Sequence, residues 1–144
     1  MASALQLGDL EFASARPAAA GGYYVSALSD AKGKARLIEA DLQSGRIVHA
    51  QLLLAMYRAV FDQGTAKVLE SELALAEGDT EAALQIARAA VKLAPESASA
   101  QYALSSVLLA AGEPTGAAHA LRVALDIDAD FSPAAITLAR IRLA

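Results

Sequence analysis

The 144-residue chain contains no cysteine, no asparagine and no tryptophan. Without cysteine it can form no disulfide, zinc–thiolate site or iron–sulfur cluster, and it has no thiolate nucleophile. Basic residues are also few, because 12 Lys and Arg stand against 16 Asp and Glu and give a formal net charge of −4. Nonspecific binding to nucleic acid depends on Lys and Arg that neutralise phosphates. Nucleic acid is therefore not expected as a partner.

Long apolar runs are missing as well. The most apolar stretch, residues 47–61, is interrupted by His49, Gln51 and Arg58. It is shorter than the roughly 20 apolar residues that a membrane-spanning helix needs. Residues 1–30 carry acidic residues before the first basic one and have no continuous apolar core. We therefore expect neither direct membrane insertion nor a secretory signal.

Motifs that carry catalysis or hold a cofactor are absent from the sequence. The chain has no HExxH metal motif, no glycine-rich phosphate loop and no GxSxG nucleophile elbow. Its two histidines, His49 and His119, are far apart in the sequence, and acidic pairs such as Glu70 and Glu72 are typical of a solvated helix face. We therefore expect no enzyme activity, no metal site and no cofactor.

Alanine and leucine dominate what is present. The chain has 37 Ala and 21 Leu, and these residues favour helix by intrinsic propensity. Its hydrophobic content is 56%, above the level of most soluble domains. The composition therefore predicts a folded, mostly helical protein.

An internal repeat is the strongest signal in the sequence. Gly78 and Gly112 are separated by 34 in the numbering, and so are several apolar pairs, such as Leu75 with Leu109, Ala83 with Ala117 and Ala90 with Ala124. The glycines carry most weight because each falls where an apolar-periodic segment would have to stop. A fainter copy upstream pairs Gly45 with Gly78 at a spacing of 33.

The repeat predicts helices separated by tight turns at the three glycines. We expect the helices over about residues 30–44, 46–61, 65–77, 81–93, 97–111, 114–127 and 133–143. Asp79 or Thr80, and later Ser132, have side chains suited to capping the helices that follow them. Small residues allow two helices to approach closely, so nearly complete burial is expected for Ala83, Ala90, Ala117 and Ala124.

These residues resemble the tetratricopeptide repeat family, whose 34-residue unit is a helical hairpin. The turn at Gly78 and Asp79, followed by Ala83, Ala90 and Pro95, is similar to the second half of the family motif. The resemblance implies an all-α fold, a right-handed α-solenoid of about three hairpins plus a C-terminal helix. It covers a repeat domain over 31–144, with repeats at about 31–64, 65–97 and 98–131 and a final helix over 132–144. The composition of residues 1–30 separately predicts an N-terminal arm or tail that is partly irregular.

The resemblance also implies a concave groove lined mainly by the first helix of each hairpin. The partner-binding positions carried onto this chain are Val68, Glu72, Leu75, Tyr102, Ser106, Leu109, Ile136 and Arg140. The family's clamp for a terminal carboxylate needs Lys and Asn, whereas Val68 and Tyr102 stand at the lysine positions and the chain has no Asn. An apolar peptide or an amphipathic helix of another protein fits this groove better. Tyr102 is either an anchor for that partner or an intramolecular contact.

Two alternatives to a protein-interaction scaffold stay open at this point. The final helix carries apolar residues on more than one face, so the chain could be a structural element that self-associates through its groove or through Ile141 and Leu143. A chaperone for a secreted or assembling protein is the other alternative. In each case the partner is another protein or a second copy of the chain.

Overall fold

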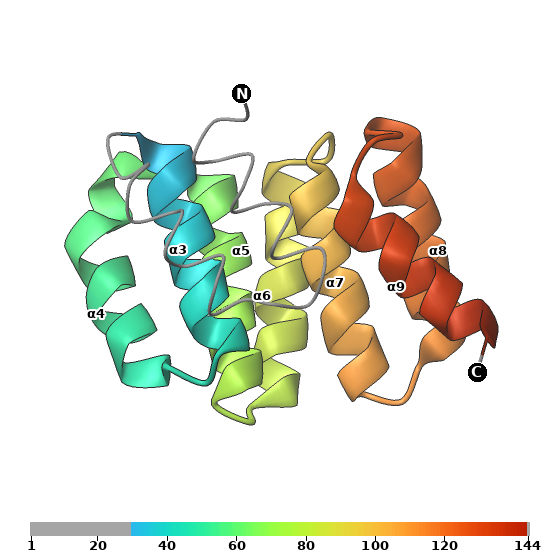
Figure 1. The fold of residues 1–144 in the computed structure, drawn as a ribbon, viewed down its shortest axis with the longest axis horizontal. Coiled ribbons are helices and arrows are strands. Elements are labelled where there is room, and N and C mark those ends of the chain that lie inside the picture. The colour runs from blue at the N-terminus through green and yellow to red at the C-terminus, as the bar shows by residue number, and fades with distance from the viewer. Residues whose placement is uncertain (1–29, 144) are drawn as a thin grey trace. The chain divides into compact units, whose positions relative to one another are not determined.

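The computed structural model describes residues 30–143, so the predicted N-terminal arm lies outside the described residues apart from Asp30. Within that range every regular element is helical, with seven α-helices, one 3-10 helix and no strand (Figure 1). The expectation of an all-α fold is confirmed for these residues. The chain divides between Asp62 and Gln63 into two compact units, and each is described by itself.

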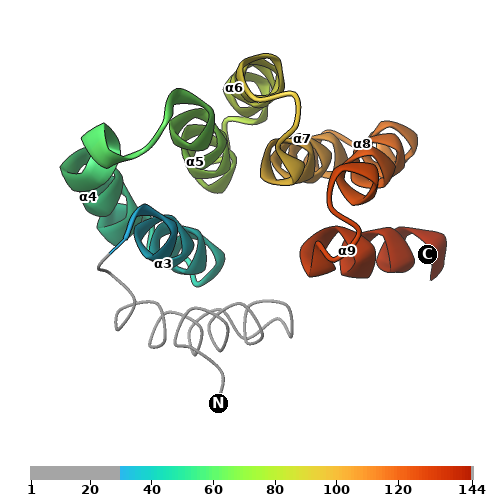
Figure 2. The same cartoon turned by 90° about the horizontal axis from the view of Figure 1, so that it is seen from above.

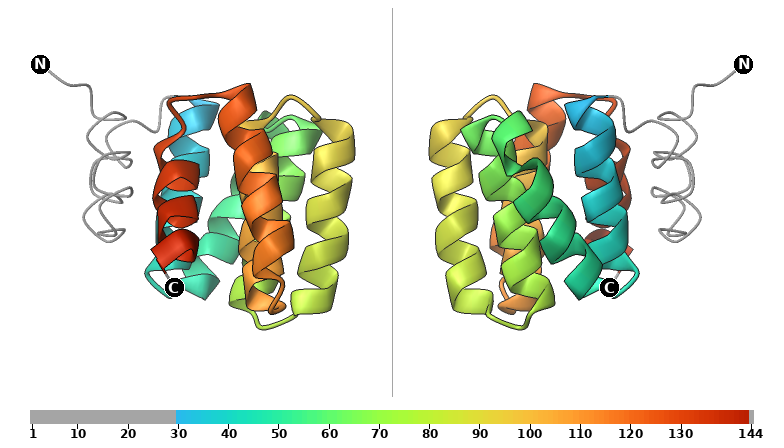
Figure 3. Two further views of the ribbon diagram at one scale, coloured as in Figure 1. Left: turned by 90° about the vertical axis from the view of Figure 1, so that its right-hand side faces the viewer. Right: turned by 90° about the vertical axis from the view of Figure 1, so that its left-hand side faces the viewer.

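The described part of the first unit is one helical hairpin. Helix α3 (Ala31–Gln43) is followed by α4 (Ile47–Tyr57) and a short 3-10 helix, η1 (Arg58–Val60). Helix α4 crosses α3 obliquely (Figure 3). The sequence predicted one continuous helix to residue 61, and this was wrong, because the α-helix ends at Tyr57. No glycine or proline marks that end in the sequence.

The second unit consists of two hairpins and a final helix. Its helices are α5 (Gln63–Ala76), α6 (Thr80–Leu93), α7 (Ala98–Ala110), α8 (Pro114–Ile127) and α9 (Ser132–Leu143). Each helix contacts the next along the chain, and α5 also contacts α7. Figure 2 looks nearly along α5 and α6 and shows α9 from its side, so the axis of α9 is tilted relative to those of α5 and α6. The bounds of these five helices agree with the expected ones to within two residues, although Ser132 is the first helical residue and not a cap.

The three hairpins turn through the same backbone geometry. Gly45, Gly78 and Gly112 have φ angles of 78°, 87° and 78°, which is the left-handed region that glycine adopts without steric cost. In each turn two N–H groups donate back to carbonyls at the end of the first helix, which would otherwise lack partners. The bonds that span five residues run from the Arg46 N–H to the Asp41 carbonyl, from Asp79 to Ala74 and from Glu113 to Leu108. The prediction of turns at the three glycines is confirmed.

Side chains cap the starts of three helices. Asp30 accepts from the Gly33 N–H at 2.7 Å, Asp79 from the Ala82 N–H at 3.1 Å, and Ser97 from the Ala100 N–H at 3.2 Å. Each bond satisfies a backbone donor in the first turn of its helix, which is why Ser, Asp and Asn are favoured at this position. The expected cap at Asp79 is confirmed.

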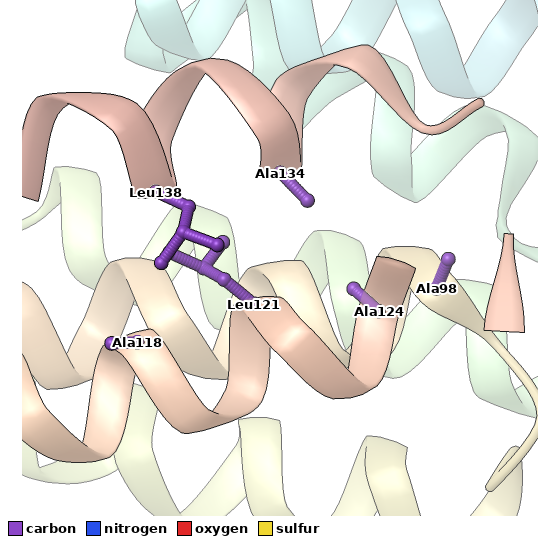
Figure 4. Packing of buried hydrophobic residues seen from close by; sticks show 6 residues of the cluster. All are labelled: Ala98, Ala118, Leu121, Ala124, Ala134 and Leu138. Atoms are coloured by element: carbon purple, nitrogen blue, oxygen red, sulfur yellow. The ribbon is translucent and has the colours of Figure 1, made fainter. Parts of the chain in front are cut away.

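Alanines and leucines form the core of the second unit. Ala83, Ala90, Ala117 and Ala124 are fully buried, as the repeat predicted. At the C-terminal end, Ala134 and Leu138 of α9 face Leu121 and Ala124 of α8 (Figure 4). The small side chains let neighbouring helices approach closely, and the leucines fill the space that remains.

Enlarging one of these alanines should disturb the contact between the hairpins. Ala90 lies fully buried on α6 against Val68 of α5 and Ala100 of α7. We expect Ala90→Leu to lower the free energy of unfolding by about 1 to 3 kcal/mol, since the added methyl groups find no free volume. Urea denaturation followed by circular dichroism measures this change. Arg88→Leu adds a leucine at an exposed position of the same helix and should have a much smaller effect, so similar losses would place Ala90 outside the core.

Candidate peptide-binding surface

The eight expected groove positions, together with Leu143, form three rows on α5, α7 and α9, with one residue of each row in each helix. A spacing of 34 brings equivalent positions of successive repeats into register. The inner row is Val68, Tyr102 and Ile136; the middle row is Glu72, Ser106 and Arg140; the outer row is Leu75, Leu109 and Leu143. All nine residues belong to the second compact unit.

Val68, in the inner row, is not accessible to a partner. Its side chain is only 4% exposed and packs with Ala90 of α6 and with Ala100 and Ala103 of α7. These alanines allow α7 to approach α5 so closely that Val68 is enclosed between them. The assignment of Val68 to the groove is therefore corrected, and Val68 belongs to the core.

Tyr102, the equivalent of Val68 one repeat later, is half-buried. Its ring meets the ring of Phe131 edge to face, with the centroids 5.8 Å apart, and packs on the cluster around Leu121 and Leu138. This is the intramolecular contact that the sequence left open as one of two roles. Ile136 is half-buried as well. The inner row thus joins each first helix to the next one, and only part of Tyr102 and Ile136 reaches the surface.

The middle row is polar. Glu72 and Ser106 are half-buried, whereas Arg140 is exposed. The Ser106 hydroxyl donates to the carbonyl of Tyr102 at 3.2 Å, and the buried hydroxyl of Ser105 donates to the same carbonyl at 2.6 Å. Ser71 precedes Ser105 by one repeat and donates in the same way to the carbonyl of Val68 at 2.9 Å. Arg140 is therefore the charged member of this row that reaches solvent most freely.

The outer row becomes more exposed from one helix to the next. Leu75 is half-buried and packs against the cluster of Ala83, Ala87 and Val107. Leu109 is 36% exposed and Leu143 is 88% exposed. Arg140 and Leu143 are both exposed and lie about one turn apart on α9, so together they offer a partner a hydrogen-bond donor and apolar area.

Ile141 and Leu143, the expected oligomer contacts, differ in their surroundings. Ile141 is half-buried and packs on the cluster that contains Ala134 and Leu138. Leu143 is almost fully solvated. The side of α9 that carries Ile141 is thus covered by the same unit, and the uncovered apolar area at this end is mainly that of Leu143.

One polar cluster, in the first unit, was not anticipated from the sequence. Asp41 is 1% exposed, yet its carboxylate lies within hydrogen-bond distance of the His49 Nδ1 and 3.5 Å from the Arg46 Nη1. The His49 and Arg46 side chains are 44% and 60% exposed, so they connect a buried carboxylate to solvent. Asp41 and His49 are eight residues apart and lie on either side of a turn, so no helical periodicity in the sequence indicates their contact.

The same pair of positions is apolar in the second unit. The carbonyls of Ala74 and Leu108 accept the same turn hydrogen bond as the carbonyl of Asp41, so the three residues are equivalent. His49 lies three residues after the donor of this bond, and the residues at the same place in the other two hairpins are Ala82 and Gly116. A methyl group placed on Gly116 would lie 3.5 Å from Cδ1 of Leu108, so the Leu108 side chain lies over this position of α8. Asp41 and His49 thus make a polar side-chain contact at positions where the second unit has apolar residues.

Residues 30–143 show no site for a metal ion and no membrane-spanning helix. Within them no group of three or more His, Cys, Asp or Glu side chains is arranged to hold a metal. No helix in this part of the chain is long and apolar enough to cross a bilayer. His119 is exposed on α8, far along the chain from the pair at Asp41 and His49.

Comparison with known proteins agrees with the repeat geometry. The chain resembles the crystal structure of TTC0263, a thermophilic TPR protein of Thermus thermophilus, with a TM-score of 0.67 and 23% sequence identity. The match covers 97% of this chain and 80% of that one, and it shows a shared fold. No curated protein sequence matches this chain. A family model described as tetratricopeptide repeat matches residues 74–141. This stretch includes both the turn at Gly78 and the turn at Gly112, and its sequence is therefore similar to the tetratricopeptide repeat family.

Proposed function

We propose that the second unit is a non-catalytic protein-interaction module that holds an apolar peptide or an amphipathic helix of another protein. Tetratricopeptide repeats generally mediate protein–protein interactions, and they do so through the surfaces that stacked hairpins present. The outer and middle rows supply a leucine and an arginine that reach solvent on neighbouring first helices.

The exposure of Leu109 is the observation that carries this proposal. Leu109 occupies the same register position as Leu75, yet it is 36% exposed. Tyr102 and Ser106 lie on the same helix, two turns and one turn before it, and Arg140 lies on α9 in the middle row. A ligand helix that lay along α7 and covered Leu109 would also reach Tyr102 and Ser106, which provide hydrogen-bonding groups beside an apolar centre.

Affinity capture with two matched variants tests this surface. Leu109 and Ile127 are almost equally exposed, at 36% and 37%, but Ile127 ends a second helix and belongs to none of the three rows. The tagged full chain, Leu109→Glu and Ile127→Glu are each incubated with an extract of the source organism. We expect proteins that bind the wild type to be retained by Ile127→Glu and depleted at least tenfold by Leu109→Glu. Identical captures by all three would contradict the proposal.

Self-association through α9 is the weaker alternative, because Ile141 is covered within its own unit. A chaperone role would use the same surface and differs in the identity of the captured protein. Mass spectrometry of the proteins that Leu109→Glu loses distinguishes these cases, since a second copy of the chain would itself be the depleted species.

A further inference from the structure

Helix α3 is enclosed on most of its sides. Its buried residues are distributed around more than half of the helix. They are Gly33, Ala35, Leu37, Ile38, Ala40, Asp41 and Leu42. Helix α9, which packs mainly against the single neighbour α8, buries only Ala134 and Leu138. One neighbouring helix, α4, therefore does not account for the burial of α3.

The side of α3 that faces away from α4 is covered as well. Asp41 points toward α4, where it meets His49. Glu39 and Arg36 precede Asp41 by two and five residues, which places them about 160° and about 140° around the helix from it. The Arg36 Nη1 and the Glu39 Oε2 are 3.0 Å apart, yet the two side chains are only 20% and 12% exposed. An ion pair on the outer side of a two-helix hairpin would be open to water, so other atoms must cover this one.

This cover belongs to α3 and not to the hairpin as a whole. On α4, the second helix of the same hairpin, the outer side is open, and Val48, Leu52 and Met56 are all exposed. The additional neighbour therefore lies along α3.

The covered positions of α3 are the groove positions of the first repeat. The spacing of 33 that relates Gly45 to Gly78 also relates Ala35, Glu39 and Leu42 to Val68, Glu72 and Leu75. Leu42 is buried, whereas Leu109 and Leu143 in later repeats are exposed. The first repeat thus differs from the later ones in having its groove side occupied.

Residues 1–29 are the remaining part of the first unit. The unit extends from Met1 to Asp62, and its described helices are α3, α4 and η1. Helix α3 is about 20 Å long, and residues 13–29 can span roughly 50 Å, so residues 5–12 can reach any point along it. Covalent attachment raises their effective concentration at α3 to about the millimolar range, where a modest apolar contact is enough for occupancy.

We propose that residues 5–12 pack along α3 and occupy the groove positions of the first repeat as an intramolecular ligand. Leu7, Leu10 and Phe12 supply the apolar area of this contact. The inference goes beyond the function proposed above, because the ligand is part of the chain itself and the surface lies in the other compact unit. Another protein can reach the groove side of α3 only by displacing this segment.

Thiol labelling of the full chain tests the inference, because the chain has no cysteine and an introduced one is the only thiol. Glu39→Cys places a thiol on the covered side of α3, and Gln43→Cys places one at an exposed position one turn further on the same helix. We expect a maleimide to label Glu39→Cys at least about tenfold more slowly than Gln43→Cys. Equal rates would show that nothing covers this side and would overturn the inference.

Substitutions in the segment identify the cover. Combined with Glu39→Cys, the triple variant Leu7→Asp, Leu10→Asp and Phe12→Asp should speed the labelling at least about fivefold, because charged side chains cannot take part in the apolar contact. The matched control adds the same charge outside residues 5–12, through Ala18→Asp, Ala19→Asp and Ala20→Asp, and should leave the labelling slow. Labelling that is unchanged by the first triple variant would overturn the inference. Labelling that slows as the protein is concentrated would make a second copy the cover.

A peptide of residues 1–29 provides a second measurement. At millimolar concentration it should slow the labelling of Glu39→Cys in the first triple variant at least about threefold, and the same peptide with the three substitutions should not. No slowing by the wild-type peptide would overturn the inference. Ala50→Cys, at a fully buried position of α4, shows whether the hairpin stays folded. If it reacts in the triple variant, the hairpin has opened and the peptide measurement decides.

Discussion

Replacing Leu121 with alanine is expected to lower the free energy of unfolding by about 2 to 5 kcal/mol, which is the range for leucine truncation in a packed core. Leu121 is fully buried at the centre of the cluster that joins α8 to Ala134 and Leu138 of α9. Its removal takes away apolar burial and leaves a cavity that the surrounding helices can close only in part. The amides of α9 should lose protection in hydrogen exchange most strongly, because α9 depends on this contact.

Ile127→Ala provides the comparison for this truncation. Ile127 lies on the same helix and is 37% exposed, so its truncation should cost less than about 1 kcal/mol. Equal losses for the two variants would show that Leu121 does not hold α9 against α8. A loss for Leu121→Ala without any change in the exchange of α9 would show the same.

Removing His49 should be nearly as damaging, and removing its partner as well should reverse most of the damage. His49→Ala leaves the buried Asp41 carboxylate with only the more distant Arg46 guanidinium. We expect a loss of about 2 to 4 kcal/mol, less than for a fully enclosed pair because water reaches His49. The double variant Asp41→Ala with His49→Ala reproduces the alanines found at positions 74 and 82. It should recover all but about 1 kcal/mol, since no uncompensated charge then remains buried.

Hydrogen exchange at the amides of α3 and α4 measures this cycle within the first unit. His119→Ala removes an exposed histidine in the second unit and should change stability by less than about 0.5 kcal/mol. If the double variant were less stable than His49→Ala, Asp41 would stabilise the first unit even without His49, and the expectation would be wrong.

Much of the helical architecture could be predicted from the sequence because its signals are local. A glycine that ends an apolar-periodic segment specifies a left-handed turn by itself, and Gly45, Gly78 and Gly112 all adopt one. Alanines at a spacing of 34 predicted where helices approach each other. The end of α4 at Tyr57 could not be predicted, because neither glycine nor proline marks it.

The details of the binding surface depend on contacts between helices, and those are not local. Val68 and Tyr102 hold the same register position, but the alanines around Val68 enclose it while Phe131 covers one side of Tyr102. Carrying the family's groove positions onto this chain assigns both residues to the groove and does not show this difference. The apolar composition of residues 47–61 was evident, but the sequence could not show that one side of α4 stays uncovered.

The three glycine turns also affect how the chain folds in time. Each turn joins the two helices of a hairpin by only a few residues, so the contacts within a hairpin connect residues that are near each other along the chain. Closing a short loop costs little entropy, and proteins rich in local contacts fold quickly. During synthesis, both helices of a hairpin are therefore available to pack against each other as soon as the second helix leaves the ribosome. Folding can then proceed one hairpin at a time, without waiting for distant parts of the chain.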